Sequence, residues 1–192
     1  MKKILIINGN PNIDSLTSAL AEAYKKGALE TGAVVEEIKI GELKFNPNLE
    51  NGYKKRMDLE PDLLEAFEKI KKADHLVWVH PVWWGGLPAL MKGFIDRLFL
   101  PNLTFRYKEN SVWWDKLLTG KTARIIATMD TPNIYYRFVY ARPSINQLKK
   151  CVLEFCGVSP VKVTSFDNIR YADSKKIEKI LNQVNLLGKN LS

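Results

Sequence analysis

Short apolar segments alternate with amphipathic segments along the whole chain. The apolar segments are rich in Val and Ile, which is typical of buried strands. They predict five strands, at residues 2–8, 33–40, 74–80, 121–128 and 159–166. Between them, apolar residues recur at helical spacing and predict helices at residues 15–31, 61–73, 88–99 and 144–156, with a terminal helix from Asp173. This alternation indicates a parallel sheet with helices on both faces.

Turn-forming residues support these boundaries. Gly32 and Gly157 follow predicted helices, and Pro61 opens one. Residues 44–60 and 100–120 show neither period and predict loops. We find no repeat or linker, so residues 1–192 are expected to form a single domain. Five parallel strands in a chain of this length are typical of the flavodoxin-like, doubly wound α/β fold, whose ligands bind at the carboxyl ends of the strands.

The formal net charge of +8 attracts anions. The basic residues are spread along the chain, and most lie on predicted helices, where a solvated face is the simplest interpretation. No motif for nucleic acids accompanies them, so we do not expect nucleic-acid binding. A positive field does favour phosphorylated cofactors such as NADPH.

The two cysteines, Cys151 and Cys156, lie five residues apart on one predicted helix and project from different sides of it. We expect free, buried thiols and therefore a reducing, cytoplasmic compartment. The cysteines and the two histidines, His75 and His80, lack the spacing of zinc ligands, so no metal site is expected. No apolar run approaches the roughly 18–20 residues of a membrane span.

The loop after the first predicted strand lacks the glycine pattern G-x-G-x-x-G, which argues against a dinucleotide-binding Rossmann domain. It places Ser15 and Thr17 at the start of a helix. Free N–H groups and the helix dipole favour an anion there, and hydroxyl groups add donors for a phosphate. The alternative is that Asp14 or Ser15 merely caps the helix.

The loop after the third predicted strand is the strongest signal, because Trp83-Trp84-Gly85-Gly86 follow Pro81 directly. A flavin ring is a flat, largely apolar plate with a polar edge. Tryptophan supplies an apolar wall for such a plate, and glycine lets the backbone approach its edge. The alternative is that the two tryptophans pack in the core or at a subunit contact.

The loop after the fourth predicted strand is polar and reads Thr128-Met129-Asp130-Thr131-Pro132-Asn133. Its side chains can hydrogen-bond the pyrimidine edge of a flavin, or they can form an ordinary turn-rich loop.

Together these loops resemble those of the NAD(P)H quinone reductases related to DT-diaphorase. That family includes the bacterial drug-activity-modulator type and the ancillary subunits of potassium efflux systems. The matching motif is Pro81-x-x-Trp84-x-x-x-Pro88-Ala89-x-x-Lys92-Gly93-Phe94-x-Asp96-Arg97-x-Phe99, followed later by Leu153-Glu154-Phe155-Cys156-Gly157. The resemblance spans roughly residues 1–170.

The resemblance implies a bound flavin, with FAD favoured over FMN, and NAD(P)H as co-substrate. It assigns cofactor contacts to Asn10, Ser15, Leu16, Thr17, Pro81, Val82, Trp83, Trp84, Gly85, Thr128, Met129, Asp130 and Thr131. It also implies a homodimer in which Phe105, Arg106 and Tyr107 of one subunit reach the substrate pocket of the other.

The implied activity is two-electron reduction of quinones by ping-pong hydride transfer through flavin N5. Tyr135 or Tyr136 matches a family tyrosine that handles charge on the reduced ring, and these are the candidate catalytic residues. A family histidine has no counterpart here; Tyr140 and Arg142 lie nearby. Arginine can stabilise an anion but cannot shuttle a proton, because its pKa is too high.

Two other functions compete with this one. Flavodoxin-type electron carriers are usually acidic and carry a Ser/Thr-rich phosphate loop, whereas this chain is basic and lacks that loop. A flavin-binding regulatory subunit of a potassium efflux transporter is the second alternative. Within the enzyme class, azo or nitro compounds are alternative acceptors.

Overall fold

The computed structural model describes residues 1–191, so Ser192 of the predicted domain lies outside the described residues. Five parallel strands form one sheet in the order β2-β1-β3-β6-β7. The strands are β1 (Lys3–Asn8), β2 (Val34–Lys39), β3 (His75–Pro81), β6 (Thr122–Thr128) and β7 (Val161–Phe166). The predicted doubly wound sheet is confirmed, and each strand begins and ends within two residues of its prediction.

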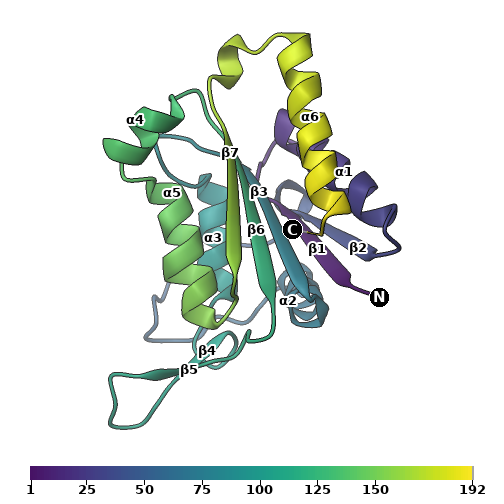
Figure 1. The fold of residues 1–192 in the computed structure, drawn as a ribbon. Coiled ribbons are helices and arrows are strands. Elements are labelled where there is room, and N and C mark those ends of the chain that lie inside the picture. The colour runs from purple at the N-terminus through teal and green to yellow at the C-terminus, as the bar shows by residue number, and fades with distance from the viewer. Residues whose placement is uncertain (192) are drawn as a thin grey trace.

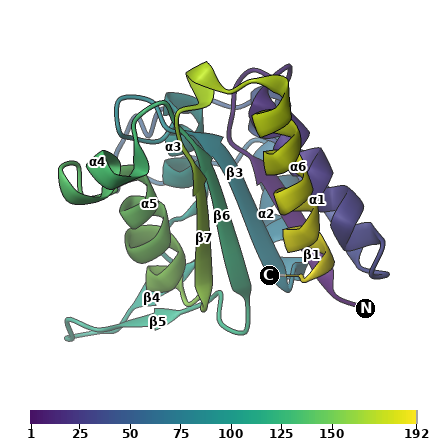
Figure 2. The ribbon, with the colours of Figure 1, turned by 45° about the horizontal axis from the view of Figure 1, so that its top comes forward.

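Helices cover both faces of the sheet, as Figures 1 and 2 show. One face is covered by α1 (Leu16–Leu29) and α6 (Ser174–Lys189), and the other by α2 (Pro61–Lys72), α3 (Ala89–Leu98) and α5 (Pro143–Asn146). Side chains alternate along β1 accordingly, with Ile4 and Ile6 in one core and Leu5 and Ile7 in the other.

The helix α5 continues directly into a π-helical segment, Gln147–Glu154, and ends before Gly157, whose φ is 105°. The predicted helix at residues 144–156 is therefore confirmed, although its winding was not foreseen. No helix within residues 1–191 is both long enough and apolar enough to cross a membrane.

Two predicted loops contain further elements. The segment at residues 100–120 forms an antiparallel hairpin of β4 (Phe105–Tyr107) and β5 (Trp114–Lys116). The loop after β6 contains the helix α4 (Asn133–Phe138). Short 3₁₀ turns occur at Ile40–Glu42 and Ile169–Tyr171. These elements span three to six residues, which is too short to display a hydrophobic period.

The hairpin lies at the amino ends of β6 and β7, at the bottom of Figure 1. Trp114 stacks on Phe155 with ring centroids 4.3 Å apart, and the Leu118 N–H donates to the Cys156 carbonyl at 2.9 Å. These contacts anchor the base of the hairpin, while its tip projects beyond the sheet.

Both cysteines are free, as predicted. Cys156 is buried, and burial raises the pKa of its thiol to about 11. Cys151 is exposed, so the prediction that both thiols are buried is wrong for it. The physical reason is that only one side of this helical segment faces the core.

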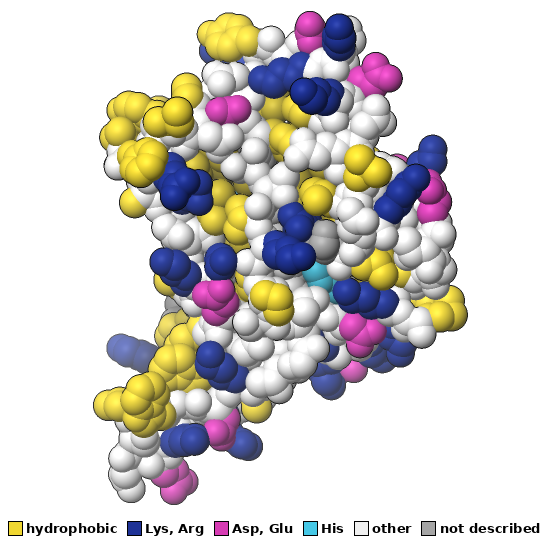
Figure 3. Space-filling model, viewed as in Figure 1, with side chains coloured by type: hydrophobic (Ala, Val, Ile, Leu, Met, Phe, Trp, Pro, Cys, Tyr) yellow, Lys and Arg dark blue, Asp and Glu magenta, His cyan; other side chains and the backbone are white. Residues whose placement is uncertain are grey.

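The surface carries two groups of exposed apolar side chains at opposite ends of the sheet (Figure 3). One group is on the hairpin and consists of Tyr107, Val112 and Trp113. The other is on and after α4 and consists of Ile134, Tyr135, Phe138, Val139 and Tyr140. Exposed apolar groups of this size mark binding surfaces more often than scattered single residues do.

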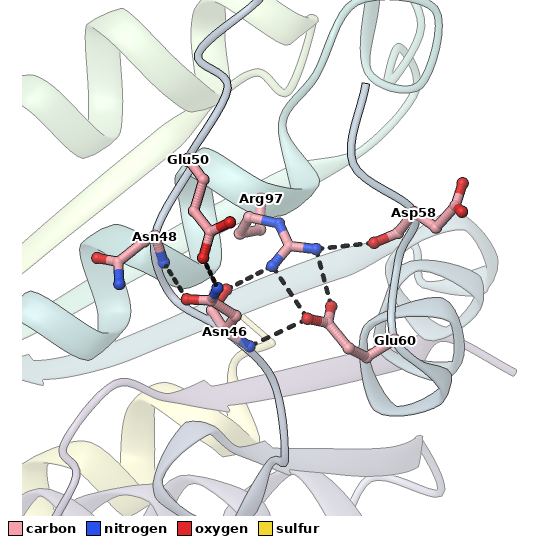
Figure 4. A network of polar contacts seen from close by, with 6 residues as sticks. All are labelled: Asn46, Asn48, Glu50, Asp58, Glu60 and Arg97. Atoms are coloured by element: carbon pink, nitrogen blue, oxygen red, sulfur yellow. Dashed lines mark hydrogen bonds and ion pairs between the residues drawn. The ribbon is translucent and has the colours of Figure 1, made fainter. Parts of the chain in front are cut away.

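A buried arginine anchors the long loop at residues 44–60, which has neither helix nor strand, as predicted. Arg97 of α3 is fully buried, and its guanidinium donates to both carboxylate oxygens of Glu60, at 3.0 and 2.9 Å. It also donates to the backbone carbonyls of Asn46 and Asp58. Figure 4 shows how these contacts join α3 to both ends of the loop.

This environment changes the pKa of the Glu60 carboxyl. Partial burial raises its pKa, but hydrogen bonds from the Asn46 backbone N–H and from the Arg97 guanidinium outweigh burial. The pKa of Glu60 therefore lies below its ordinary value, and the charged form is the one that the fold stabilises.

Candidate functional site

A cleft of about 480 Å³ opens at the carboxyl ends of β3 and β6. It is lined by Val82, Trp84, Gly85, Asp130, Thr131, Tyr140 and Pro143. The structure thus brings together residues from two of the predicted loops. Tyr140 and Pro143 are additions to the predicted site. A sequence signal existed only for Tyr140, which lies near the position where the resemblance implies a histidine.

A tight turn presents Trp84 to the cleft. The backbone groups of Trp83 and Gly86 bond each other reciprocally, at 3.1 and 2.9 Å. The φ angles of the two residues between them are 51° for Trp84 and 75° for Gly85, which describes a type I′ turn. Glycine tolerates such an angle, but tryptophan is strained by it.

The indole of Trp84 is fully exposed. It therefore contributes nothing to the core that would offset its backbone strain. Strained residues that persist without a packing role concentrate at ligand-binding sites. This combination makes Trp84 the strongest candidate for a ligand contact.

Hydrogen bonds from the Tyr136 hydroxyl hold this turn in place. It is buried, and its hydroxyl lies 3.1 Å from the Gly85 carbonyl and 2.7 Å from the Ser144 hydroxyl, while it accepts from the Ser144 N–H at 3.1 Å. The Ser144 N–H also reaches the Gly85 carbonyl at 3.1 Å. The hydroxyl of Tyr136 is thus engaged by the protein and joins α4, α5 and the turn.

Removing that hydroxyl tests its role. Tyr136→Phe is expected to lower the free energy of unfolding by about 1–3 kcal/mol, because buried donors and acceptors lose a partner. Urea unfolding measures the change. Tyr135→Phe is the matched control, with an expected change within about 0.5 kcal/mol because its side chain is exposed. Equal effects of the two substitutions would contradict the assigned role.

The other candidate catalytic tyrosine, Tyr135, is exposed and meets Tyr140 edge-on at 5.1 Å. Neither Tyr135 nor Tyr136 is among the residues that line the cleft, whereas Tyr140 is. The tyrosine ring available to a ligand in the cleft is therefore that of Tyr140.

Four other predicted residues of these loops lie near the cleft without lining it. Pro81, Thr128 and Met129 are buried at the strand ends, and Trp83 is exposed beside the turn. The Val82 N–H donates to the Thr128 carbonyl at 2.8 Å and so ties the two loops together. The carboxylate of Asp130 is held by the Arg170 N–H at 2.8 Å.

The first loop forms a cluster of hydroxyl and amide groups at the start of α1. Ser15 is the N-cap and accepts weakly from the Ser18 N–H at 3.4 Å, so the capping alternative holds for Ser15. Its hydroxyl also lies 2.9 Å from that of Thr17, which accepts from the Asn10 amide at 3.0 Å. Leu16 supplies the first helical N–H, which has no partner within the helix.

This cluster lies beside the strand that carries the cleft, because β1 pairs with β3 and the Gly9 N–H donates to the Val79 carbonyl at 2.8 Å. Asn8 also belongs to it, through its amide on the Ser18 hydroxyl at 2.9 Å. Sequence reasoning missed Asn8, although a polar residue that ends an apolar strand is a signal for it.

Phe105 and Tyr107 lie on the hairpin at the opposite end of the sheet from the cleft. Phe105 is buried against Phe155, with ring centroids 5.0 Å apart, and Tyr107 is exposed. Neither can line the cleft of its own chain.

His80 is the one histidine next to the site. It is fully buried, and its Nδ1 donates to the Pro81 carbonyl at 3.0 Å. Burial lowers its pKa to about 4. The ring is therefore neutral near pH 7. Because it is fully buried and does not line the cleft, it does not take the place of the histidine that the resemblance implies for the loop after β6.

Comparisons with known proteins relate this chain to oxidoreductases. An NAD(P)H oxidoreductase of Escherichia coli, YcaK, is 30% identical over 128 residues, which cover 62% of this chain and 65% of that protein. The match therefore spans just under two thirds of that relative's length. An FMN-dependent NADH:quinone oxidoreductase of Listeria monocytogenes is 28% identical over 93% of this chain and 92% of its own.

Among solved structures, Smu.1420 of Streptococcus mutans superposes with a TM-score of 0.84 at 28% identity, covering 98% of this chain and 99% of its own. A family model described as flavodoxin-like fold matches residues 2–186, nearly the whole chain. The chain belongs to this flavodoxin-like family.

Proposed function

We propose that this protein is a flavin-dependent NAD(P)H oxidoreductase that reduces quinones or related acceptors. The observation that carries the proposal is the exposed indole of Trp84 on a strained turn, at the mouth of a cleft where this fold binds ligands. The relatives named above as NAD(P)H and NADH:quinone oxidoreductases support it.

The residues present fit a flavin. Trp84 and Val82 offer an apolar wall, and Asp130 and Thr131 offer polar groups across the cleft. The hydroxyl groups of Ser15 and Thr17, with the helix dipole of α1, suit the flavin phosphate. When bound, the flavin would accept a hydride from the nicotinamide and reduce the acceptor.

For the flavin itself we propose FMN. The resemblance favoured FAD, but the Listeria monocytogenes relative, which aligns with nearly the whole chain, is named as FMN-dependent. The hydroxyl cluster at α1 suits the single phosphate of FMN.

The chain's own groups would orient the reactants and exclude water. Tyr136 holds the turn that carries Trp84, and it acts through the backbone of Gly85. Tyr140, whose ring lines the cleft, is the proposed group for charge that develops on the bound ring. Arg142, two residues further on, can add electrostatic stabilisation but no proton transfer.

We further propose a homodimer in which the exposed Tyr107 of one chain covers the cleft of the other. Phe105, which is buried in its own chain, packs edge-on against Tyr107 at 5.2 Å and supports it. The exposed apolar side chains on the hairpin and around α4 support this arrangement, since a two-fold axis can bring one group onto the other. Sedimentation equilibrium at micromolar concentration should give the mass of two chains. A single-chain mass would contradict the dimer.

We also propose a cytoplasmic location, which the free thiols support.

Steady-state kinetics tests the activity. Protein loaded with FMN should oxidise NADPH or NADH rapidly when menadione is present, with the parallel-line pattern of a ping-pong reaction. An electron carrier would show no appreciable turnover without a separate reductase, and that result would contradict the proposed function.

A further inference from the structure

A second cavity, a groove of about 570 Å³, runs along the outer edge of β7. Its lining includes five cationic side chains, and none of the described residues that line it is acidic. The five are Arg124, Arg142, Lys149, Lys150 and Lys162. Figure 3 shows Lys and Arg side chains gathered around the place where Figure 1 draws β7. We call this cavity the basic groove.

Part of this charge is already engaged by the protein. The Lys149 ammonium donates to the Val161 carbonyl at 2.9 Å and lies 3.8 Å from the Glu154 carboxylate. Arg124 donates to the Thr164 hydroxyl at 2.6 Å. Lys150 and Lys162 are exposed, and neither forms an ion pair within residues 1–191. Several like charges close together repel one another, so the basic groove favours an anion with more than one charge.

Neighbouring residues of one segment line the cleft and the basic groove. Tyr140 and Pro143 line the cleft, while Arg142, between them in the chain, lines the groove. Ala141 and Arg142 have φ angles of 57° and 51°, an unfavourable pair for residues other than glycine. We call this pair of left-handed residues the reversal. It places neighbouring side chains in the two different cavities.

Hydrogen bonds hold the reversal in place. The Arg142 N–H donates to the Tyr136 carbonyl at 2.9 Å, and the Asn146 N–H donates to the Arg142 carbonyl at 2.8 Å. The Asn146 side chain also donates to the Ala141 carbonyl. From Pro143 to Lys150 the helical backbone advances on the order of 10 Å, so cations continue well beyond the cleft. A ligand that uses both cavities must be long, with its anionic part away from the cleft.

We infer that the basic groove binds the phosphate-bearing half of NADPH while the nicotinamide lies in the cleft. This inference rests on the proposed function and adds a specificity to it. A dinucleotide has the required length, and the 2′-phosphate that distinguishes NADPH from NADH adds up to two negative charges far from the nicotinamide. Lys and Arg form strong charge-assisted hydrogen bonds with phosphate. The protein therefore prefers NADPH to NADH.

The double substitution Lys150→Gln and Lys162→Gln removes two exposed charges from the basic groove without touching the cleft. In FMN-loaded protein, the dissociation constant for NADP⁺ should rise about tenfold and the kcat/KM for NADPH should fall about tenfold. The corresponding changes for NAD⁺ and NADH should be much smaller. Dihydronicotinamide riboside, which lacks every phosphate, should react with unchanged kcat/KM. Raising the salt concentration should weaken the wild-type preference for NADPH.

Lys72→Gln, an exposed lysine on α2, is the matched charge control and should change none of these values. A wild-type protein that uses NADPH and NADH equally would overturn the inference. So would a double variant that retains the wild-type constants for NADP⁺ and NADPH, as expected if the groove serves a macromolecular polyanion instead. Absence of turnover with all three donors would instead contradict the proposed function.

Discussion

Trp84→Ala is expected to weaken FMN binding by about 2–3 kcal/mol, a rise of roughly 30- to 150-fold in the dissociation constant. The indole is fully exposed and lines the cleft, so its loss removes the apolar wall on which a flat ring would lie. A titration of the protein with FMN, in which binding is monitored by the quenching of flavin fluorescence, measures the dissociation constant.

The same substitution should leave the free energy of unfolding within about 0.5 kcal/mol of wild type, because the side chain makes no core contact. Alanine keeps the backbone strain at this position, so the turn itself is unchanged. Leu64→Ala, which truncates an exposed apolar side chain on α2, is the control and should not alter FMN binding. An unchanged FMN constant in Trp84→Ala would contradict the assigned ring site.

Glu60→Gln is expected to lower the free energy of unfolding by about 3 kcal/mol, near the lower end of the range for breaking a buried ion pair. The Arg97 guanidinium is fully buried and would lose its only carboxylate partner within the described residues. Glu60 itself is partly exposed, which limits the effect. Urea unfolding provides the measurement.

Glu65→Gln supplies the contrast. Glu65 pairs with Lys69 at 2.7 Å on the surface of α2, where an ion pair contributes at most about 1 kcal/mol. A double variant, Glu60→Gln with Arg97→Met, should be less destabilised than Glu60→Gln alone, because no uncompensated buried charge remains. If Glu60→Gln cost no more than Glu65→Gln, the role of Arg97 as an anchor would be refuted.

The Glu60–Arg97 pair also predicts a pH dependence. The pKa of Glu60 is lower in the folded protein than in the unfolded chain, so its contribution is complete above the ordinary pKa of glutamate. It is lost as the pH falls through the lower, folded pKa. The stability difference between wild type and Glu60→Gln should therefore be constant near neutral pH and shrink in acid. A stability difference that grows as the pH falls would contradict this role of the Glu60–Arg97 pair.

Most of the fold could be predicted because the inner strands β1, β3 and β6 are mostly apolar, and the helices between the strands have clear periods. The edge strands β2 and β7 are more polar, but Val, Ile and Phe still mark them. The location of the cleft followed from topology, since parallel strands end at one edge of a sheet. That rule placed the segments with Trp84 and Asp130 side by side before any contact was known. The hairpin and α4 escaped prediction because they are too short to show a period.

The rest of the site depends on backbone geometry that cannot be predicted from the residue types at these positions. Tyr140 and Pro143 reach the cleft through two left-handed residues, Ala141 and Arg142, although such angles favour glycine or asparagine. The Arg142–Pro143 step adds to this, because a residue before proline usually avoids helical angles. Likewise, nothing in the spacing links Arg97 to Glu60, which lies 37 residues away.

The central claim is that a flavin binds where β3 ends, against Trp84. The most direct measurement is the visible absorption spectrum of the purified protein, with mass identification of any cofactor released on denaturation. The account predicts a yellow protein that carries FMN, or that takes up added FMN in a one-to-one ratio. A colourless protein that leaves added FMN and FAD unbound would contradict it.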